Sequence, residues 1–283
     1  MPCGKSDNTP TREVPDHWDA AHIRRSRERL LSAAAKAIRD EIKGSPDHGQ
    51  IEEIKLDTSS QSSVTAFSAE YLKRHQKLDI LVNNAGVMGF PYTQSVDGFE
   101  LIVATNHLGP FALTASLMDA LKRSPSARVV ALSSAMHHSA KYTPGELFMS
   151  EKKHNETTVY GNSKLYNLLF AFELGRRLEA AGHTNITSVA CHPGIQGIFL
   201  KRWAYNFMNA TLTQSTTMGA LPTLYAAVAP GVKSGDFYGP SGFAAMRGYP
   251  SLQEPAEIAR SLDAAADVWS TTERILGLKF KVQ

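Results

Sequence analysis

The sequence predicts an α/β fold, a single domain built on a doubly wound parallel sheet. Strand-like and helix-like segments alternate along the chain, and the strands are apolar throughout instead of alternating with polar residues. Such strands are typical of a parallel sheet that helices cover on both faces. Polar clusters also follow four of the strands, at the edge where open sheets of this kind bind ligands.

The first part of the chain is expected to form two helices and two strands. Apolar residues at helical spacing predict a helix over 27–43, which ends at a Gly and a Pro. IEEIKLD at 51–57 is typical of a short strand, and KLDILV at 77–82 predicts a second one that runs directly into NNAG. Between them, apolar residues at helical spacing predict a helix around Val64, Phe67, Tyr71 and Leu72.

The rest of the chain continues the alternation. A mostly helical stretch over 99–121 leads to the β-branched strand ARVVALSS at 127–134, and a long helix over 157–180 leads to the strand ITSVAC at 186–191. Beyond residue 200 we expect a helix, a turn-rich stretch and a final helix, at 215–229, 237–243 and 255–275.

Composition narrows the class of protein. The 283 residues carry 30 basic and 27 acidic side chains without a long run of like charge, so no nucleic-acid partner is expected. The N-terminus lacks an apolar signal region, and no uninterrupted apolar run is long enough to predict a membrane span. The two cysteines form no disulfide framework, which favours a cytoplasmic location. We expect a disordered tail and leader over 1–24 and the domain over 25–283, with a substrate lid around 197–250.

The spacing of Tyr160 and Lys164 points to chemistry. Four residues apart on a helix, the two side chains share one face. A cation near a phenol favours the phenolate and lowers its pKa, so the pair can act as an acid and base toward an alcohol or a carbonyl. Taken alone, so short a pattern favours an exposed Tyr and Lys that share a surface helix by chance.

Five stretches together resemble the short-chain dehydrogenase/reductase family, within its retinol-dehydrogenase-like branch. They occur in the family's order and the resemblance covers roughly 25–245: KLDILVNNAGVM, DGFE with TNHLGPF, ARVVALSSAMHH, VYGNSKLYNLLF and VACHPG. The resemblance implies a Rossmann-like fold, an NADP or NAD cofactor, a small-molecule alcohol or carbonyl substrate, and the homo-oligomers that the family often forms through its long helices.

The resemblance also implies four catalytic residues. Tyr160 would exchange a proton with the substrate oxygen, and Lys164 would lower the pKa of Tyr160 and bond the nicotinamide ribose. Ser134 would hydrogen-bond the substrate oxygen, where charge develops. Asn106 would hold a water that links Lys164 to a proton relay. Taken singly, Ser134 could instead cap a strand, and Asn106 could be a buried polar residue satisfied by backbone.

Cofactor contacts are implied at further positions. Arg25 matches the arginine that contacts the 2′-phosphate of NADP in many members, and Asp57 would lie by the adenine unless it is an ordinary strand-end residue. Small residues in the NNAG stretch would let the adenosine ribose approach the backbone, at Asn83, Ala85 and Gly86. The same stretch could be only a turn. The turn at Pro193 would lie under the nicotinamide.

The family's glycine-rich turn is missing from the sequence. No glycine occurs between Gly4 and Gly44, so nothing matches the TGxxxGxG turn that meets the pyrophosphate at a helix N-terminus. HWDAAHI at 17–23 resembles the leader before the family's first strand, and RRSRERL at 24–30 resembles the stretch after its second strand. The predicted fold is therefore N-terminally incomplete by about 30–40 residues. An incomplete gene model or splice form, a degraded paralogue, or a protein reworked for another ligand would each explain this.

Other departures and clusters are weaker indicators. Ile198 stands where the family usually has a Thr that bonds the nicotinamide carboxamide. His137, His138 and His154 lack the spacing of a metal-ligand set and are interpreted as loop histidines. Several large side chains could line an apolar lid or simply belong to the core: Phe199, Leu200, Trp203, Tyr205, Phe207 and Met208.

Two functions are consistent with these observations. The first is an NAD(P)-dependent oxidoreductase that interconverts an alcohol and a carbonyl on an apolar small molecule, with NADP slightly favoured by Arg25. The second is a non-catalytic relative that cannot hold the dinucleotide and acts as a binding or dimerising module. Binding of NADPH distinguishes the two.

Overall fold

A computed structural model describes residues 33, 35–43, 49–194, 215–242 and 245–282, and the chain divides into two compact units, 1–55 and 56–283. In the first unit residues 35–42 are helical, as predicted for 27–43, and the start of that helix lies outside the described residues. The Arg39 guanidinium bonds the carbonyl oxygen of Ile51 at 3.0 Å and pairs with Glu53 at 2.9 Å. The predicted tail over 1–24 also lies outside the described residues.

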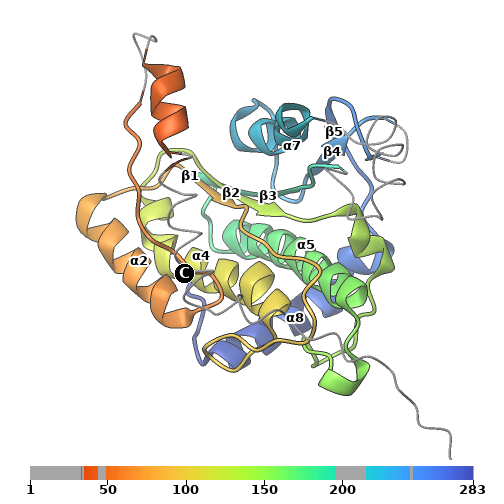
Figure 1. Cartoon of the computed structure of the whole chain (residues 1–283). Helices are drawn as coiled ribbons and strands as arrows, with labels where there is room; N and C mark the ends of the chain where they lie inside the picture. The colour runs from red at the N-terminus through yellow and green to blue at the C-terminus, as the bar shows by residue number, and fades with distance from the viewer. Residues whose placement is uncertain (1–32, 34, 44–48, 195–214, 243–244, 283) are drawn as a thin grey trace, which may run out of the picture. The chain divides into compact units, whose positions relative to one another are not determined.

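The second unit is built on a five-stranded sheet in the order β1-β2-β3-β4-β5 (Figure 1). The strands are β1 (Ile80–Asn83), β2 (Ala127–Leu132), β3 (Ile186–Cys191), β4 (Phe237–Pro240) and β5 (Pro250–Leu252). The first four run parallel, and β5 pairs antiparallel with β4. This confirms the predicted α/β class with a largely parallel sheet.

Helices cover both faces of the sheet. They are α2 (Gln61–Arg74), α4 (Gly109–Lys122), α5 (Glu156–Ala180), α7 (Thr216–Val228) and α8 (Leu262–Leu276). Figure 1 shows α7 on one face and α4, α5 and α8 on the other. Helix α3 (Leu101–Val103) and a π-helical turn lead into α4, and three short 3₁₀ helices occur in the connections: Ala135–Ser139, Glu151–Lys153 and Glu257–Arg260.

The apolar strands explain this two-sided cover. Successive side chains of a strand point to opposite faces. Val129 packs into the core on the α4 and α5 side, whereas Val130 and Leu132 pack against the α7 side. Both faces of β2 therefore exclude water, which is why this strand has no alternating polar residues.

Helix α8 lies along α5, and the segment after it extends the contact. The ring of Trp269 packs 5.0 Å from Phe111 of α4, 5.8 Å from Phe170 of α5 and 4.7 Å from Phe280. Arg177 of α5 lies over the Trp269 ring, 4.3 Å from its centre. The C-terminal segment therefore completes the core between α4 and α5.

Two predicted features of the fold are wrong. Residues 51–57 form no strand, because they pair with no strand of the described residues and a strand requires a hydrogen-bonded partner. The stretch predicted as turn-rich at 237–243 begins with β4, because Phe237 and Tyr238 pair with β3. Strand β5 lies antiparallel at the edge of a sheet that is otherwise parallel, as predicted.

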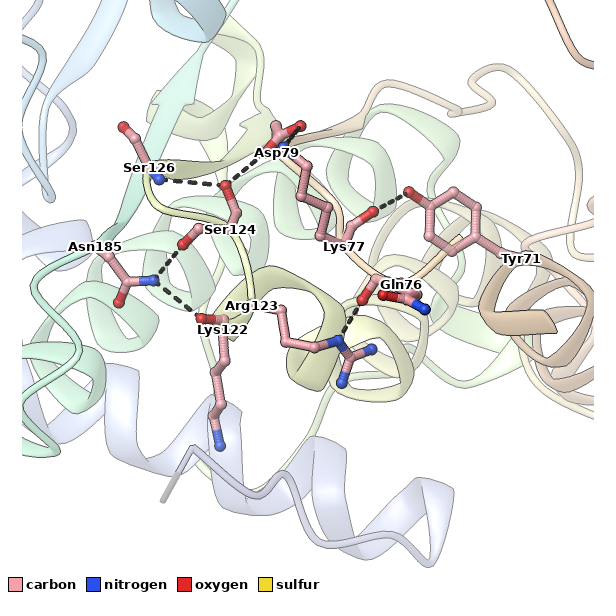
Figure 2. A network of polar contacts seen from close by, with 9 residues as sticks. All are labelled: Tyr71, Gln76, Lys77, Asp79, Lys122, Arg123, Ser124, Ser126 and Asn185. Carbon is pink, nitrogen blue, oxygen red and sulfur yellow. Dashed lines mark hydrogen bonds and ion pairs between the residues drawn. The ribbon is translucent and has the colours of Figure 1, made fainter. Parts of the chain in front are cut away.

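Hydrogen bonds tie the amino ends of the strands to the preceding loops (Figure 2). The Ser124 hydroxyl donates to Asp79 at 2.6 Å, and Asn185 donates to the carbonyl oxygens of Lys122 and Ser124. The Tyr71 hydroxyl donates to the carbonyl of Lys77 at 2.9 Å. A shallow hollow of about 560 Å³ lies beside this network. These contacts fix the sheet at the edge opposite the predicted site.

The stretch Leu101–Lys122 is long and apolar enough to cross a membrane by composition, and 83% of its apolar window is buried inside the structure. Such burial is typical of the core helix of a globular domain, where apolar residues pack against the sheet instead of lipid.

Gly109 is expected to be essential for stability. At this position a Cβ atom would lie 2.0 Å from the carbonyl oxygen of Thr58, where backbone blocks it. We expect Gly109→Ala to lower the free energy of unfolding by about 1–3 kcal/mol or more, because α2 and α4 must separate to admit the methyl group. Chemical denaturation measures the change. Gly49→Ala is the control, since no atom lies within 4 Å of its Cβ position; equal stability of both variants would contradict the prediction.

Candidate active site

The carboxyl ends of three parallel strands bring the predicted residues to one edge of the sheet. β1 ends at Asn83, β2 is followed by Ser133 and Ser134, and β3 is followed by His192 and Pro193. The register aligns these ends, since Asn83 pairs with Ala131 and Leu132 with Cys191. Because parallel strands end at a common edge, segments far apart in sequence form one site.

Helix α5 carries the two residues that first suggested chemistry. Asn155 caps the helix by accepting from the N–H of Thr158 at 2.9 Å, so α5 begins one turn before Tyr160. The Tyr160 phenol is hydrogen-bonded to the side chain of Ser134. The ammonium of Lys164 lies 5.4 Å from the centre of the Tyr160 ring. The structure thus brings together the predicted serine, tyrosine and lysine.

Tyr160 keeps its proton at neutral pH in this structure. Burial raises the pKa of the phenol above its ordinary value, and the hydrogen bond from Ser134 opposes that rise. The expected lowering by Lys164 is not seen. The ammonium lies 5.4 Å from the centre of the Tyr160 ring and donates to the backbone carbonyl of Leu132. The site as it stands is therefore an acid.

Lys164 is a buried cation with unused donors. Its side chain is 5% exposed, and its ammonium donates to the carbonyl oxygen of Leu132 at 3.3 Å. Burial lowers the pKa of Lys164 to about 8, and the nearby Cys191 opposes this effect. An ammonium has three N–H donors, so Lys164 can still bond hydroxyl groups of a ligand.

Asn106 lies in a π-helical turn, Ala104–Leu108, between α3 and α4. Its amide oxygen accepts from the N–H of Val87 at 2.7 Å, and its amide nitrogen donates to the Val87 carbonyl at 2.9 Å and to the Ser163 hydroxyl at 3.0 Å. Ser163 in turn donates to the Tyr160 carbonyl at 2.7 Å. These contacts join the loop after β1 to α5; the relay water at Asn106 stays a prediction.

The backbone of Gly86 lies close to the lysine. A Cβ atom there would lie 3.2 Å from both the Asn106 amide oxygen and the Lys164 ammonium. Ala85 and Gly86 are exposed, so the backbone of this loop is accessible to a ligand. The amide nitrogen of Asn83 instead donates to the Thr114 hydroxyl at 3.0 Å, so only the backbone of Asn83 is available at this edge of the sheet. The arrangement fits a ribose whose hydroxyl groups accept from Lys164.

Asp57 is not at the end of a strand and serves as a turn residue. Its carboxylate accepts from the N–H of Ser59 at 3.0 Å and the hydroxyl of Ser59 at 2.6 Å, which forms the turn before α2. Contact of Asp57 with an adenine stays a prediction. Arg25, Ile198 and the proposed lid residues up to Met208 lie outside the described residues.

The histidines have structural partners. The imidazole of His137 bonds the Ser134 carbonyl at 2.5 Å and accepts from the N–H of Ala256 at 3.0 Å. His154 lies 3.5 Å from the buried carboxylate of Glu100. Within the part of the chain that the structure describes, no group of three or more metal-ligating side chains could hold an ion.

Sequence patterns did not single out two polar residues near Lys164. Ser163 links Asn106 to α5, and Asn167 donates to the same Leu132 carbonyl as Lys164, at 2.9 Å. A usable signal existed for Asn167, since it follows Lys164 by three residues on an otherwise apolar helix face.

Known proteins resemble the chain over the region that holds this site. A family model for short chain dehydrogenases matches residues 20–197. Retinol dehydrogenase 12 of Mus musculus is 36% identical over 256 residues, which cover 88% of this chain and 76% of that protein. Retinol dehydrogenase 14 of Mus musculus is 34% identical over 243 residues, with 81% and 68% covered.

Solved structures show the same fold. An uncharacterised protein of Mycobacterium paratuberculosis superposes with a TM-score of 0.68 at 33% identity, over 86% of this chain and 82% of that one. A short-chain dehydrogenase/reductase of Serratia marcescens has a TM-score of 0.51 at 17% identity, over 73% and 80% of the two chains.

Proposed function

Since the chain belongs to the short-chain dehydrogenase/reductase family, on its retinol-dehydrogenase-like branch, we propose that it is an NAD(P)-dependent oxidoreductase with Tyr160 as the acid and base. The family model describes short chain dehydrogenases, and the relatives named above are retinol dehydrogenases, which supports an enzyme that interconverts an alcohol and a carbonyl. The observation that supports the role of Tyr160 is its hydrogen bond to Ser134, with the Lys164 ammonium 5.4 Å from its ring.

Each residue has a distinct task in this proposal. Ser134 donates to the substrate oxygen and holds it near the phenol. Tyr160 gives its proton to that oxygen as charge develops on it, and takes the proton back in the reverse direction. Lys164 binds ribose hydroxyls with the donors that Leu132 does not use. Because burial keeps Tyr160 protonated, the site suits proton donation to a carbonyl.

The cofactor, when bound, supplies or accepts the hydride. We propose NADP, or NAD, on the basis of the family and of Arg25, whose side chain would meet a 2′-phosphate. Lys164 and the backbone at Ala85 and Gly86 would hold the nicotinamide ribose end, and Pro193 would lie beneath the ring. The chain has no glycine-rich turn for the pyrophosphate between Gly4 and Gly44, so affinity is expected to depend more on these contacts.

The substrate and location are further parts of the proposal. An apolar alcohol or carbonyl suits the large side chains of residues 199–208, and the relatives named above are retinol dehydrogenases. We also propose a cytoplasmic protein, because the two cysteines form no disulfide framework. The alternative of a non-catalytic binding or dimerising module is favoured only by the missing glycine-rich turn.

NADPH binding tests the proposal directly. We expect micromolar binding, followed by the change in NADPH fluorescence, and at least about tenfold weaker binding for Gly86→Ala, because the methyl group would occupy the space beside Asn106 and Lys164. Gly49→Ala should bind as the wild type does. Absence of binding by the wild-type protein would refute the enzyme and favour the non-catalytic module.

A further inference from the structure

Two side chains of α5 share one backbone acceptor at the end of β2. The Leu132 carbonyl oxygen receives the Lys164 ammonium at 3.3 Å and the Asn167 amide nitrogen at 2.9 Å. Asn167 follows Lys164 by three residues, so both side chains lie on the face of α5 that meets the sheet. The Lys164 ammonium is therefore placed at the Leu132 carbonyl oxygen, which also accepts from the Asn167 amide.

The amide oxygen of Asn167 has a buried partner of its own. Its amide oxygen lies 3.3 Å from Nδ1 of His107, and Nε2 of His107 lies 2.9 Å from the Thr272 hydroxyl of α8. The three side chains of this buried relay, Asn167, His107 and Thr272, are 4%, 1% and 0% exposed. Water cannot replace these contacts, so each member depends on its neighbour.

Each contact of the relay uses a defined atom. Asn167 donates its amide nitrogen to Leu132, so its amide oxygen faces Nδ1 of His107. Burial lowers the pKa of His107 to about 4, so the ring is neutral and only one of its nitrogens carries a proton. The Thr272 hydroxyl donates its single proton to the Val268 carbonyl at 2.6 Å and meets Nε2 of His107 through its oxygen.

We propose that Asn167 is a positioning residue for Lys164, and that His107 and Thr272 hold Asn167 in the orientation that this requires. The inference deepens the proposed function and rests on the role given there to Lys164. Asn167 shares the Leu132 oxygen with the ammonium and makes the shorter of the two bonds, 2.9 Å against 3.3 Å. Because Ser133 and Ser134 directly follow Leu132, the same contact steadies the strand end that carries Ser134.

The titration of Lys164 in the protein without cofactor or substrate tests the proposal. With isotope-labelled lysine, the Cε resonance of Lys164 is followed by NMR against pH and assigned by its loss in Lys164→Met. In Asn167→Leu the Leu132 oxygen keeps only the ammonium as a side-chain donor and binds it more tightly. We expect the pKa of Lys164 to rise by about 0.5–1, the size of one hydrogen bond. Tyr160 and Cys191 are the titratable side chains nearest to Lys164, and neither is changed.

A matched pair of variants in α8 guards against a folding defect. Thr272→Val removes the hydroxyl that meets Nε2 of His107 with little change of shape, and should shift the pKa of Lys164 upward by less than Asn167→Leu does. Thr271→Val changes the adjacent buried threonine, which has no place in the relay, and should leave it unchanged. If the pKa of Lys164 is unchanged in both Asn167→Leu and Thr272→Val, the proposal is overturned. If Asn167→Leu does not fold, the comparison of Thr272→Val with Thr271→Val decides, and equal pKa values of Lys164 in these two variants overturn the proposal.

Kinetics supply the second readout. For Asn167→Leu we expect kcat with NADPH to fall about tenfold with KM for the carbonyl nearly unchanged, because orientation is lost while substrate contacts remain. A wild-type protein that reduces no carbonyl refutes the proposed function, and the NMR titration still decides the role of Asn167. If the wild type reduces the carbonyl but Asn167→Leu leaves the pKa of Lys164 unchanged, the positioning role of Asn167 is refuted and the proposed function stands.

Discussion

Tyr160→Phe is expected to lower kcat for carbonyl reduction with NADPH by about 10²–10⁴-fold, the usual contribution of a general acid. The substitution removes the proton that the substrate oxygen receives and the bond between Tyr160 and Ser134, while the ring remains in place. Affinity for NADPH should change little, since Lys164 still offers its donors. Steady-state rates and fluorescence titration of the same preparations measure both quantities.

Tyr166→Phe is the matched control for this experiment. Tyr166 lies on the same helix and is 1% exposed, and its hydroxyl contacts the carbonyls of Leu147 and Glu146 at 3.4–3.5 Å and the side chain of Asn162. Its loss should leave kcat near that of the wild type. If Tyr160→Phe retained the same rate as Tyr166→Phe, Tyr160 would have no acid role.

Lys164→Met is expected to change activity and stability in opposite directions. Activity should fall by at least about 10²-fold, because a donor that orients the reacting groups is lost. Stability at pH 7 should rise by roughly 1–3 kcal/mol, because a depression of the pKa from 10.5 to about 8 corresponds to a cost of burying the cation of at most roughly 3–4 kcal/mol. Methionine fills the same space without charge.

The pH dependence gives the sign of this effect. Below pH 8 Lys164 is protonated in both the folded and the unfolded chain, and the cost of burial is complete. Between pH 8 and 10.5 the unfolded chain binds more protons than the folded one, so the stability of the wild type rises with pH. The advantage of Lys164→Met should therefore shrink across this window in urea titrations, whereas Lys153→Met, at an exposed position, should show no such trend. A Lys164→Met variant less stable than the wild type at pH 7 would contradict the prediction.

Sequence patterns predicted the elements whose periodicity is local. The strand Ile186–Cys191 and the long helix Glu156–Ala180 lie within a few residues of their predicted bounds, and the helix Gln61–Arg74 includes the four apolar residues that predicted it. The family and the largely parallel sheet are confirmed as well. The strand at 51–57 failed because its formation depends on a partner, which no local pattern records.

The sequence predicted those parts of the site whose positions follow from the direction of the parallel strands. Parallel strands end at one edge, so the sequence alone could place Ser134 and Pro193 there. The lowered pKa expected for Tyr160 failed because it depends on where the Lys164 ammonium points and on burial, and both arise only from packing. The roles of Arg25 and Asp57 toward a cofactor stay predictions.

Helix α8 has a consequence for the core between α4 and α5. Trp269 and Phe280 pack against the apolar surface of those helices, from within the same chain. Assembly through the long helices, which the resemblance to the family implies, stays a prediction. The C-terminal segment thus seals this surface with its own aromatic rings.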